Sequence, residues 1–136
     1  MNILRAANAA TSFEYNCDLR RLYPWPGVSD PLWGSSMASV RPDSATTPHS
    51  HDEEETFLIL SGAGRIDIDG KSSDVARGDV IYLPRHCRHF ITNVSADAPL
   101  EFLTIYWGSP EANARMERMV AASEAGRSDR EAALAK

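Results

Sequence analysis

Hydrophobic and polar residues alternate in short runs through the middle of the chain, which is the period-two pattern of half-buried β-strands. The clearest run is Arg65-Ile66-Asp67-Ile68, and the Asp69-Gly70 that follows it is typical of a tight hairpin turn. The pattern predicts strands over residues 33–40, 46–51, 56–60, 65–68, 80–83, 88–94 and 100–107. Many short strands at regular spacing indicate an all-β sandwich or barrel.

The first part of the chain, residues 1–32, has a mixed pattern. Pro24 and Pro26 exclude a helix there, because proline lacks a backbone donor and clashes with the preceding turn. The aromatic residues around these prolines suggest a segment that packs on the predicted barrel or closes its open end. We therefore interpret residues 1–32 as an N-terminal arm and residues 33–108 as the barrel.

The pattern changes again after residue 107. Ser109-Pro110-Glu111 predicts a helix start, with a serine cap, a proline in the first turn and an acid near the positive end. We expect the helix to end near Gly126 and a polar tail or linker to follow, so residues 109–136 form the third segment. One face should pack on the barrel or on a second subunit, and it carries Met116, Met119, Val120 and Ser123.

Composition narrows the functional classes. A chain of 136 residues is one domain by length, and a net charge of −5 without a basic cluster argues against nucleic-acid binding. No apolar stretch approaches a membrane span, and the first residues lack the apolar core of a signal peptide. Cys17 and Cys87 are too few for a disulfide framework. We therefore expect free thiols and a cytoplasmic location.

Two blocks of sequence carry the candidate chemistry. The first has the form H-x-H-x3-E, with His49, His51 and Glu55, and the second has His89 eleven positions after Gly78. In a strand, residues i and i+2 face the same side, so His49 and His51 can bind one ion together. Glu55 follows after a short acidic turn, whereas His89 needs a closed sheet to reach them. Three imidazoles and one carboxylate are typical ligands of a divalent transition metal.

These blocks resemble the two motifs of the cupin superfamily, over about residues 33–107. Gly62, Gly78, Pro84 and Asn93 stand where the family has them, and we interpret Pro84 and Asn93 as structural. The chain departs at Asp43 and His86, where the family usually has glycine. Both residue types tolerate a left-handed backbone better than most. The resemblance implies a jelly-roll β-barrel, here with a short C-terminal helix.

The resemblance also implies one divalent metal ion held by His49, His51, Glu55 and His89. Zinc is the metal that we expect, and Fe(II), Mn(II) and Ni(II) are alternatives that the same ligands accept. The lack of cysteine ligands argues against a closed structural zinc site. An open site would leave room for a small-molecule substrate and would make Glu55 either a ligand or a base.

Strand parity adds further candidates for the pocket. Tyr82 and Cys87 are candidate catalytic residues beside Glu55, since Cys87 lies two positions before His89. A thiol near a metal can be reactive, although a free cysteine is more often a small buried hydrophobic residue. The same parity argument selects five more residues, most of which would simply be core: Ser35, Met37, Phe57, Ile59 and Ile91.

These residues predict a metal-dependent enzyme that acts on a small polar metabolite. A narrower resemblance rests on Tyr23-Pro24-Trp25, the acidic run from Asp52 to Glu55, and Ile105-Tyr106-Trp107. These strings are similar to the cupin domain of hydrazine synthetases, enzymes of natural-product biosynthesis in which a zinc cupin accompanies a methionyl-tRNA-synthetase-like domain. That resemblance implies rearrangement of an aminoacyl ester of an N-hydroxylated amine into an N–N bonded product. It also implies a fused or separate synthetase-like partner.

Two other classes of function stay open. One is an Fe(II) dioxygenase, and the other is a non-catalytic cupin that senses or binds a small ligand. The resemblance to cupins also raises the hypothesis of a homodimer.

Overall fold

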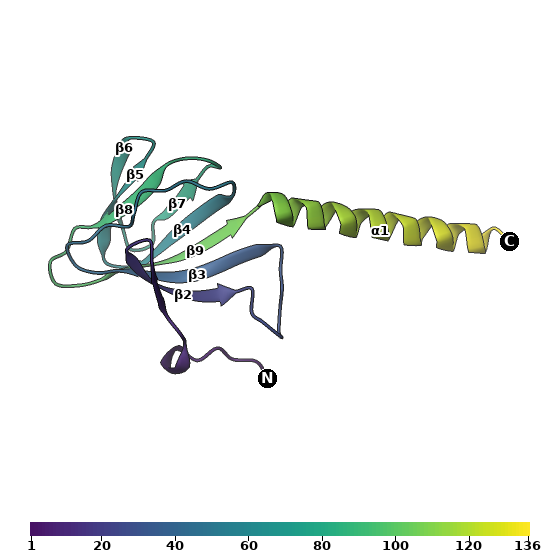
Figure 1. Ribbon diagram of the computed structural model, residues 1–136, viewed down its shortest axis with the longest axis horizontal. Coiled ribbons are helices and arrows are strands. Elements are labelled where there is room, and N and C mark those ends of the chain that lie inside the picture. The colour runs from purple at the N-terminus through teal and green to yellow at the C-terminus, as the bar shows by residue number, and fades with distance from the viewer.

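The computed structural model describes residues 1–136, which form two antiparallel sheets and one long helix (Figure 1). One sheet has six strands in the order β1-β2-β3-β9-β4-β7, and the other has three in the order β6-β5-β8. The elements are a short 3-10 turn η1 (Ala6–Asn8), β1 (Ser12–Glu14), β2 (Cys17–Tyr23), β3 (Trp33–Val40), β4 (Glu54–Ser61), β5 (Ala63–Ile68), β6 (Lys71–Ala76), β7 (Val80–Leu83), β8 (His89–Asn93), β9 (Leu100–Trp107) and α1 (Pro110–Leu134).

The predicted all-β class with a C-terminal helix is confirmed. The two sheets are not joined into one continuous hydrogen-bonded barrel, and the hydrophobic core lies between them. Both sheets contribute to that core, which consists of Cys17, Leu19, Ala38, Val40, Phe57, Ile59, Ile66, Ile81, Leu83, Cys87, Ile91, Leu100 and Phe102.

The predicted turn chemistry is confirmed at three places. Asp69 and Gly70 both have positive φ, 51° and 82°, and join β5 to β6. Asp43 and His86, which replace the family's glycines, have φ of 54° and 65°. These two side chains therefore adopt the left-handed backbone that glycine would otherwise supply.

The segment interpreted as an arm supplies two strands of the larger sheet. β2 pairs with β3 from Asp18 opposite Ser39 to Tyr23 opposite Ser35, and its alternate residues Cys17 and Leu19 belong to the core. Pro24 follows β2 directly. The prolines that suggested an irregular arm thus mark only the end of this strand.

Residues 46–51 do not form the regular strand that their pattern predicted. The segment touches β8 through two isolated bridges only, Ala45 opposite Thr92 and His49 opposite His89. Pro48 lies between them and has no backbone N–H to give to a ladder. The segment is therefore extended without being a full member of the sheet.

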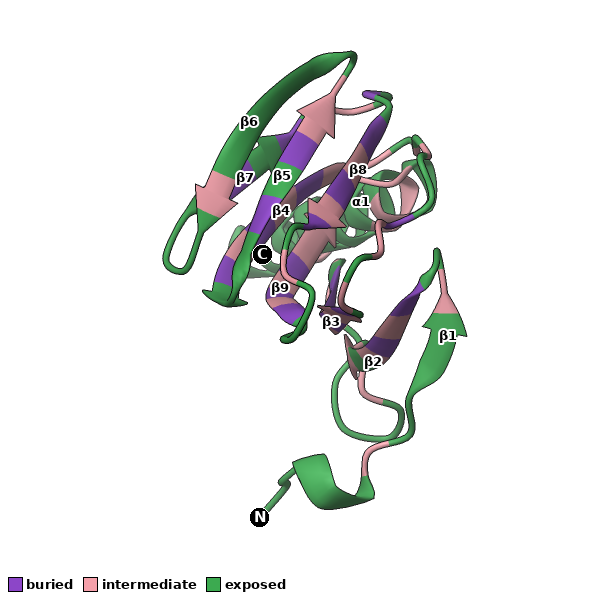
Figure 2. Ribbon diagram, turned by 90° about the vertical axis from the view of Figure 1, so that its left-hand side faces the viewer, coloured by how far each residue is buried: buried purple, intermediate pink, exposed green.

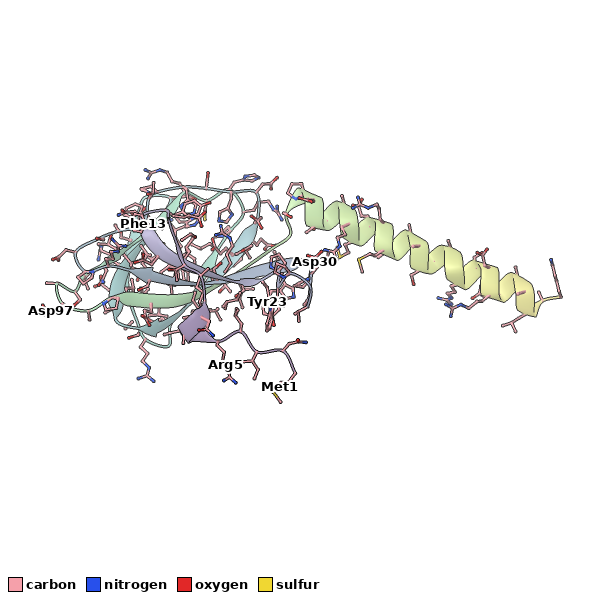
Figure 3. All side chains as sticks on the ribbon, turned by 60° about the horizontal axis from the view of Figure 1, so that its bottom comes forward. Met1, Arg5, Phe13, Tyr23, Asp30 and Asp97 are labelled. Atoms are coloured by element: carbon pink, nitrogen blue, oxygen red, sulfur yellow. The ribbon has the colours of Figure 1, made fainter.

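Helix α1 starts as predicted but continues farther. The Ser109 hydroxyl accepts a hydrogen bond from the Ala112 N–H at 3.1 Å, and the helix runs through Gly126, the residue expected to end it. It projects away from the sheets, and none of its residues is buried (Figure 1). Its apolar face therefore does not pack on the barrel, and the alternative, packing on a second subunit, stays a prediction. Near its start, Arg115 bonds to Asp30, which Figure 3 labels beside the helix.

Asn93 joins three separate parts of the backbone. Its side chain is 2% exposed, and its amide nitrogen donates to the carbonyls of Val40 at 3.0 Å and Ala98 at 2.8 Å. Its amide oxygen accepts from the Ser95 N–H at 2.9 Å. These contacts support the structural role predicted for this residue.

Asn93→Ala should lower the free energy of unfolding by about 2–3 kcal/mol, because the buried Val40 carbonyl, the Ala98 carbonyl and the Ser95 N–H lose their partner. Urea unfolding followed by circular dichroism measures this change. Asn113→Ala, which removes an exposed amide bonded to the Gly108 carbonyl, is the matched control and should change stability by less than about 0.5 kcal/mol. Metal stoichiometry should stay near that of the wild type in both variants. A folded Asn93→Ala protein that no longer bound metal would contradict the structural assignment.

Candidate metal centre

His49 and His89 meet because their backbones pair directly. The His89 N–H donates to the His49 carbonyl at 2.9 Å, and the His49 N–H donates to the His89 carbonyl at 3.2 Å. Directly opposed residues of an antiparallel pair extend their side chains to the same face. The two imidazole ring centroids accordingly lie 4.5 Å apart.

His51 completes the group of histidines. Its ring centroid lies 5.7 Å from that of His49 and 5.2 Å from that of His89. Ligand nitrogens of the three side chains all lie within 4.8 Å of one another. The sequence prediction that these three residues come together is therefore confirmed.

Backbone carbonyls orient two of the three rings. His49 Nδ1 donates to the Thr47 carbonyl at 2.7 Å, and His89 Nδ1 donates to the Cys87 carbonyl at 3.1 Å. Because a carbonyl only accepts, each Nδ1 carries the proton in the neutral ring and leaves the Nε2 lone pair free. This arrangement of backbone partners is common behind metal-binding histidines.

Glu55 reaches the same point from β4, in the opposite sheet. Its Oε2 accepts a hydrogen bond from His51 Nε2 at 2.8 Å and lies 3.5 Å from His89 Nε2. Burial raises the Glu55 pKa, but the hydrogen bond from His51 and the nearby His89 imidazole together outweigh burial, and the net pKa lies below its usual value. The same hydrogen bond raises the His51 pKa, whereas burial lowers that of His49.

Two nitrogens of this group lack a hydrogen-bond partner although they are buried, His51 Nδ1 and His89 Nε2. Buried polar atoms are normally paired, so an unpaired imidazole nitrogen beside a carboxylate fits a ligand that is itself a Lewis acid. The donor set of imidazole nitrogens and one carboxylate fits a divalent transition metal and includes no thiolate.

Each of the four consecutive acids has a different environment. Asp52 pairs with Arg85 at 2.7 Å, Glu53 borders the cavity with its pKa raised chiefly by burial, and Glu54 accepts from the Tyr82 hydroxyl at 2.6 Å. Only Glu55 contacts the histidines. Tyr82 is 53% exposed on the outer side of β7, so the structure does not bring this candidate catalytic residue to the centre.

Cys87 lies next to the centre but does not border the cavity. It is 5% exposed, and its sulfur lies 3.7 Å from His89 Nδ1. Burial raises the pKa of its thiol, which disfavours the nucleophilic thiolate. The contribution that the structure shows for this residue is its carbonyl, which orients His89.

A cavity of about 260 Å³ opens beside the metal centre. Its wall is apolar at one side and polar at the other, and it consists of Tyr15, Cys17, Leu19, Arg21, Ser36, Ala38, Thr46, His49, His51, Glu53, Glu55, Phe57, Phe102, Thr104 and Tyr106. Its size suits a small molecule.

Strand parity selected the wrong face of β3. Ser36 and Ala38 border the cavity, in place of Ser35 and Met37. The run Gly34-Ser35-Ser36 is buried throughout and has no hydrophobic contrast from which parity could be read. Of the other parity candidates, Phe57 borders the cavity, whereas Ile59 and Ile91 belong to the core.

Sequence reasoning missed a group of four residues of the cavity wall, Tyr15, Cys17, Leu19 and Arg21. All come from the β1–β2 hairpin that was interpreted as an arm. The alternation of Cys17, Leu19 and Arg21 with other residues was the available indication. Burial raises the pKa of the Cys17 thiol to about 11, so this cysteine is also a neutral wall residue.

The chain belongs to the cupin family, because the model of the cupin domain matches residues 36–106. A Photorhabdus luminescens protein of known structure is 30% identical, with a TM-score of 0.75 over 89% of this chain and 99% of that one. A cupin 2 conserved barrel domain protein from Salinispora arenicola is 26% identical, with a TM-score of 0.75 over 87% of this chain and 98% of that one.

An uncharacterized protein of Methanocaldococcus jannaschii is 37% identical over 80 residues, which make up 58% of this chain and 61% of the relative. The chain thus spans less than two thirds of the length of the curated relatives that it matches. The single helix, α1, is not apolar enough over its length to cross a membrane.

Replacing one histidine of the centre should weaken zinc binding. We expect His51→Ala to lower the affinity about 100-fold or more, since loss of an outer partner alone costs about 10- to 100-fold. Competition with a chromophoric chelator measures the affinity. His86 is the one histidine outside the centre, its side chain is 67% exposed, and His86→Ala should bind zinc as the wild type does. Equal affinity in the two variants would contradict the assignment of the centre.

Proposed function

We propose that this cupin is a metal-dependent enzyme that acts on a small polar metabolite. The observation that carries the proposal is a set of three imidazoles and one carboxylate beside a cavity of about 260 Å³, whose wall includes His49, His51 and Glu55. His49, His51 and His89 would hold the ion, and Glu55 would be a fourth ligand or a base. A bound divalent metal would supply Lewis-acid polarisation of a substrate carbonyl or amine.

Glu55 is suited to moving a proton beside the histidines. Its pKa is lowered overall, so the carboxylate is the form that a substrate would meet near neutral pH. It is 8% exposed, which limits competition from water. Its contact with His51 Nε2 fixes one carboxylate oxygen in place and leaves the other for substrate.

The rest of the wall would bind and orient the substrate. Arg21 is the only cationic side chain of the wall, and Glu14 holds its guanidinium in place through two hydrogen bonds. Phe57 and Phe102 stack at the apolar side with ring centroids 4.4 Å apart. A substrate with an apolar part and a polar or anionic part would match a wall that has both phenylalanine rings and an arginine.

The finer proposal is rearrangement of an aminoacyl ester of an N-hydroxylated amine. In that isomerisation the amino nitrogen attacks the ester-bound nitrogen, the N–O bond breaks, and the carboxylate leaves as the N–N bond forms. The attacking amine must lose a proton, which Glu55 could accept. The support is the resemblance to hydrazine synthetase cupins, together with the place of Glu53 and Tyr106, residues of two of the similar strings, in the cavity wall.

Elemental analysis of protein purified without added metal is the first test. Zinc together with N–N bonded product from the ester would support the finer proposal. Iron with oxygen uptake would replace it by an oxygenase, and metal without turnover of either substrate type would favour the binding module. A protein that takes up no divalent metal would refute the proposed class of enzyme.

Glu55→Gln should keep the fold and most of the metal, because three histidines remain. Turnover should fall by about 100-fold or more, as expected for loss of a general base. Glu54→Gln is the matched control, since Glu54 is adjacent in sequence but bonds to Tyr82 on the outer side. The measurements are product formation and metal content of both variants. A fully metallated Glu55→Gln protein with wild-type turnover would exclude the proposed role.

A further inference from the structure

The β1–β2 hairpin, which Figure 2 labels, turns at Tyr15 and Asn16, between the paired residues Glu14 and Cys17. Tyr15 and Asn16 both have positive φ, 52° and 59°. Asparagine tolerates this backbone, but for tyrosine it costs about 1–2 kcal/mol. A bulky residue persists there only when surrounding contacts hold it in place.

Those contacts all go to the segment that carries His49. The Thr47 N–H donates to the Tyr15 carbonyl at 2.9 Å, and the Asn16 amide donates to the Ala45 carbonyl at 2.8 Å. On its other edge this segment has its two isolated bridges to β8, the Thr46 hydroxyl that accepts from the Ile91 N–H, and the His51 carbonyl that accepts from the His86 N–H. The hairpin tip therefore supplies the second support of a segment that is not part of a regular ladder.

Tyr15 also contacts the imidazole itself. Its ring stacks on the His49 ring with centroids 4.6 Å apart and an interplanar angle of 29°. The Thr47 carbonyl accepts from His49 Nδ1, while the Thr47 N–H donates to Tyr15. The rotation of the His49 ring is thus fixed at its edge by Thr47 and at its face by Tyr15.

We propose that Tyr15 is a positioning residue for His49, which holds the ring so that Nε2 faces His51 and His89. This role rests on the metal site proposed above and goes beyond it, because it assigns metal affinity to a residue outside the ligand set. The aromatic ring of Tyr15 positions His49, because the face of the ring makes the contact and the hydroxyl does not. Tyr15 also borders the cavity, so the same side chain shapes the space beside the metal.

The hairpin offers its own control. Phe13, which Figure 3 labels, lies on β1 two residues before Tyr15, and its ring packs under the Arg41 guanidinium at 4.6 Å. Phe13→Ala and Tyr15→Ala therefore remove similar aromatic rings from one hairpin, and only the second touches His49. Tyr15→Phe keeps the stacked ring without the hydroxyl.

Zinc affinity measured by chelator competition should fall about 10-fold in Tyr15→Ala, in the range expected for loss of an outer partner. It should stay within about twofold of the wild type in Tyr15→Phe and in Phe13→Ala. Circular dichroism and urea unfolding establish that each variant is folded. Wild-type affinity in a folded Tyr15→Ala protein, or an equal loss in Phe13→Ala, would overturn the proposal.

Two further measurements keep the test decisive. If Tyr15→Ala fails to fold, Tyr15→Leu retains apolar cover without the aromatic stack, and its zinc affinity should still fall below that of Tyr15→Phe. A zinc affinity equal to that of Tyr15→Phe would refute the role.

Imidazole nitrogen NMR of metal-free protein reports the protonation state of the His49 ring directly. Its Nδ1-protonated form should be retained in Tyr15→Phe and mixed with the other tautomer in Tyr15→Ala. If wild-type protein bound no zinc, the proposed function would fail, while the NMR comparison would still decide the role of Tyr15.

Discussion

The reciprocal hydrogen bonds between the backbones of His49 and His89 are the constraint on which the candidate metal centre depends. They place two imidazoles from distant parts of the sequence on one face, with ring centroids 4.5 Å apart. Pro48 prevents a longer ladder in this segment, so the pairing is local and needs outside support. Without this one bridge, the imidazoles of His49 and His89 would not lie together beside His51 and Glu55.

Support for that bridge comes from both ends of the segment. The tip of the β1–β2 hairpin holds residues 45–47, and Arg85 holds the other end through the carbonyl and carboxylate of Asp52. The same guanidinium donates to the Gly108 carbonyl, between β9 and α1. The ligand segment is thus tied to the larger sheet although it pairs only with the smaller one.

Burial sets the chemistry of the centre. Glu55 is 8% exposed and lies between His51 and His89, where its contacts with these imidazoles outweigh the cost of burying a carboxylate. Cys17 and Cys87 show the opposite effect, because burial without a cationic partner raises the pKa of each thiol. The cavity wall therefore includes the ionised Glu55 carboxylate and the neutral Cys17 thiol, while Cys87 is a neutral thiol behind the centre.

The sequence by itself determined the fold class and the four side chains that meet at the candidate centre. Alternation of hydrophobic and polar residues predicted the strands. The spacing of His49, His51, Glu55 and His89 predicted which side chains converge, because both patterns follow from the order of residues alone. Tertiary structure decided the rest. Tyr15 and Arg21 of the cavity wall come from the β1–β2 hairpin, which pairs with β3 across a proline-containing connection. Tyr82 faces outward, as does Thr56, the residue opposite it on β4. Helix α1 continues through Gly126 although none of its residues is buried. Local helix propensity and the Arg127–Glu131 pair stabilise this part of the helix. Contacts between segments far apart in sequence leave no local pattern, so only the assembled sheets fixed them.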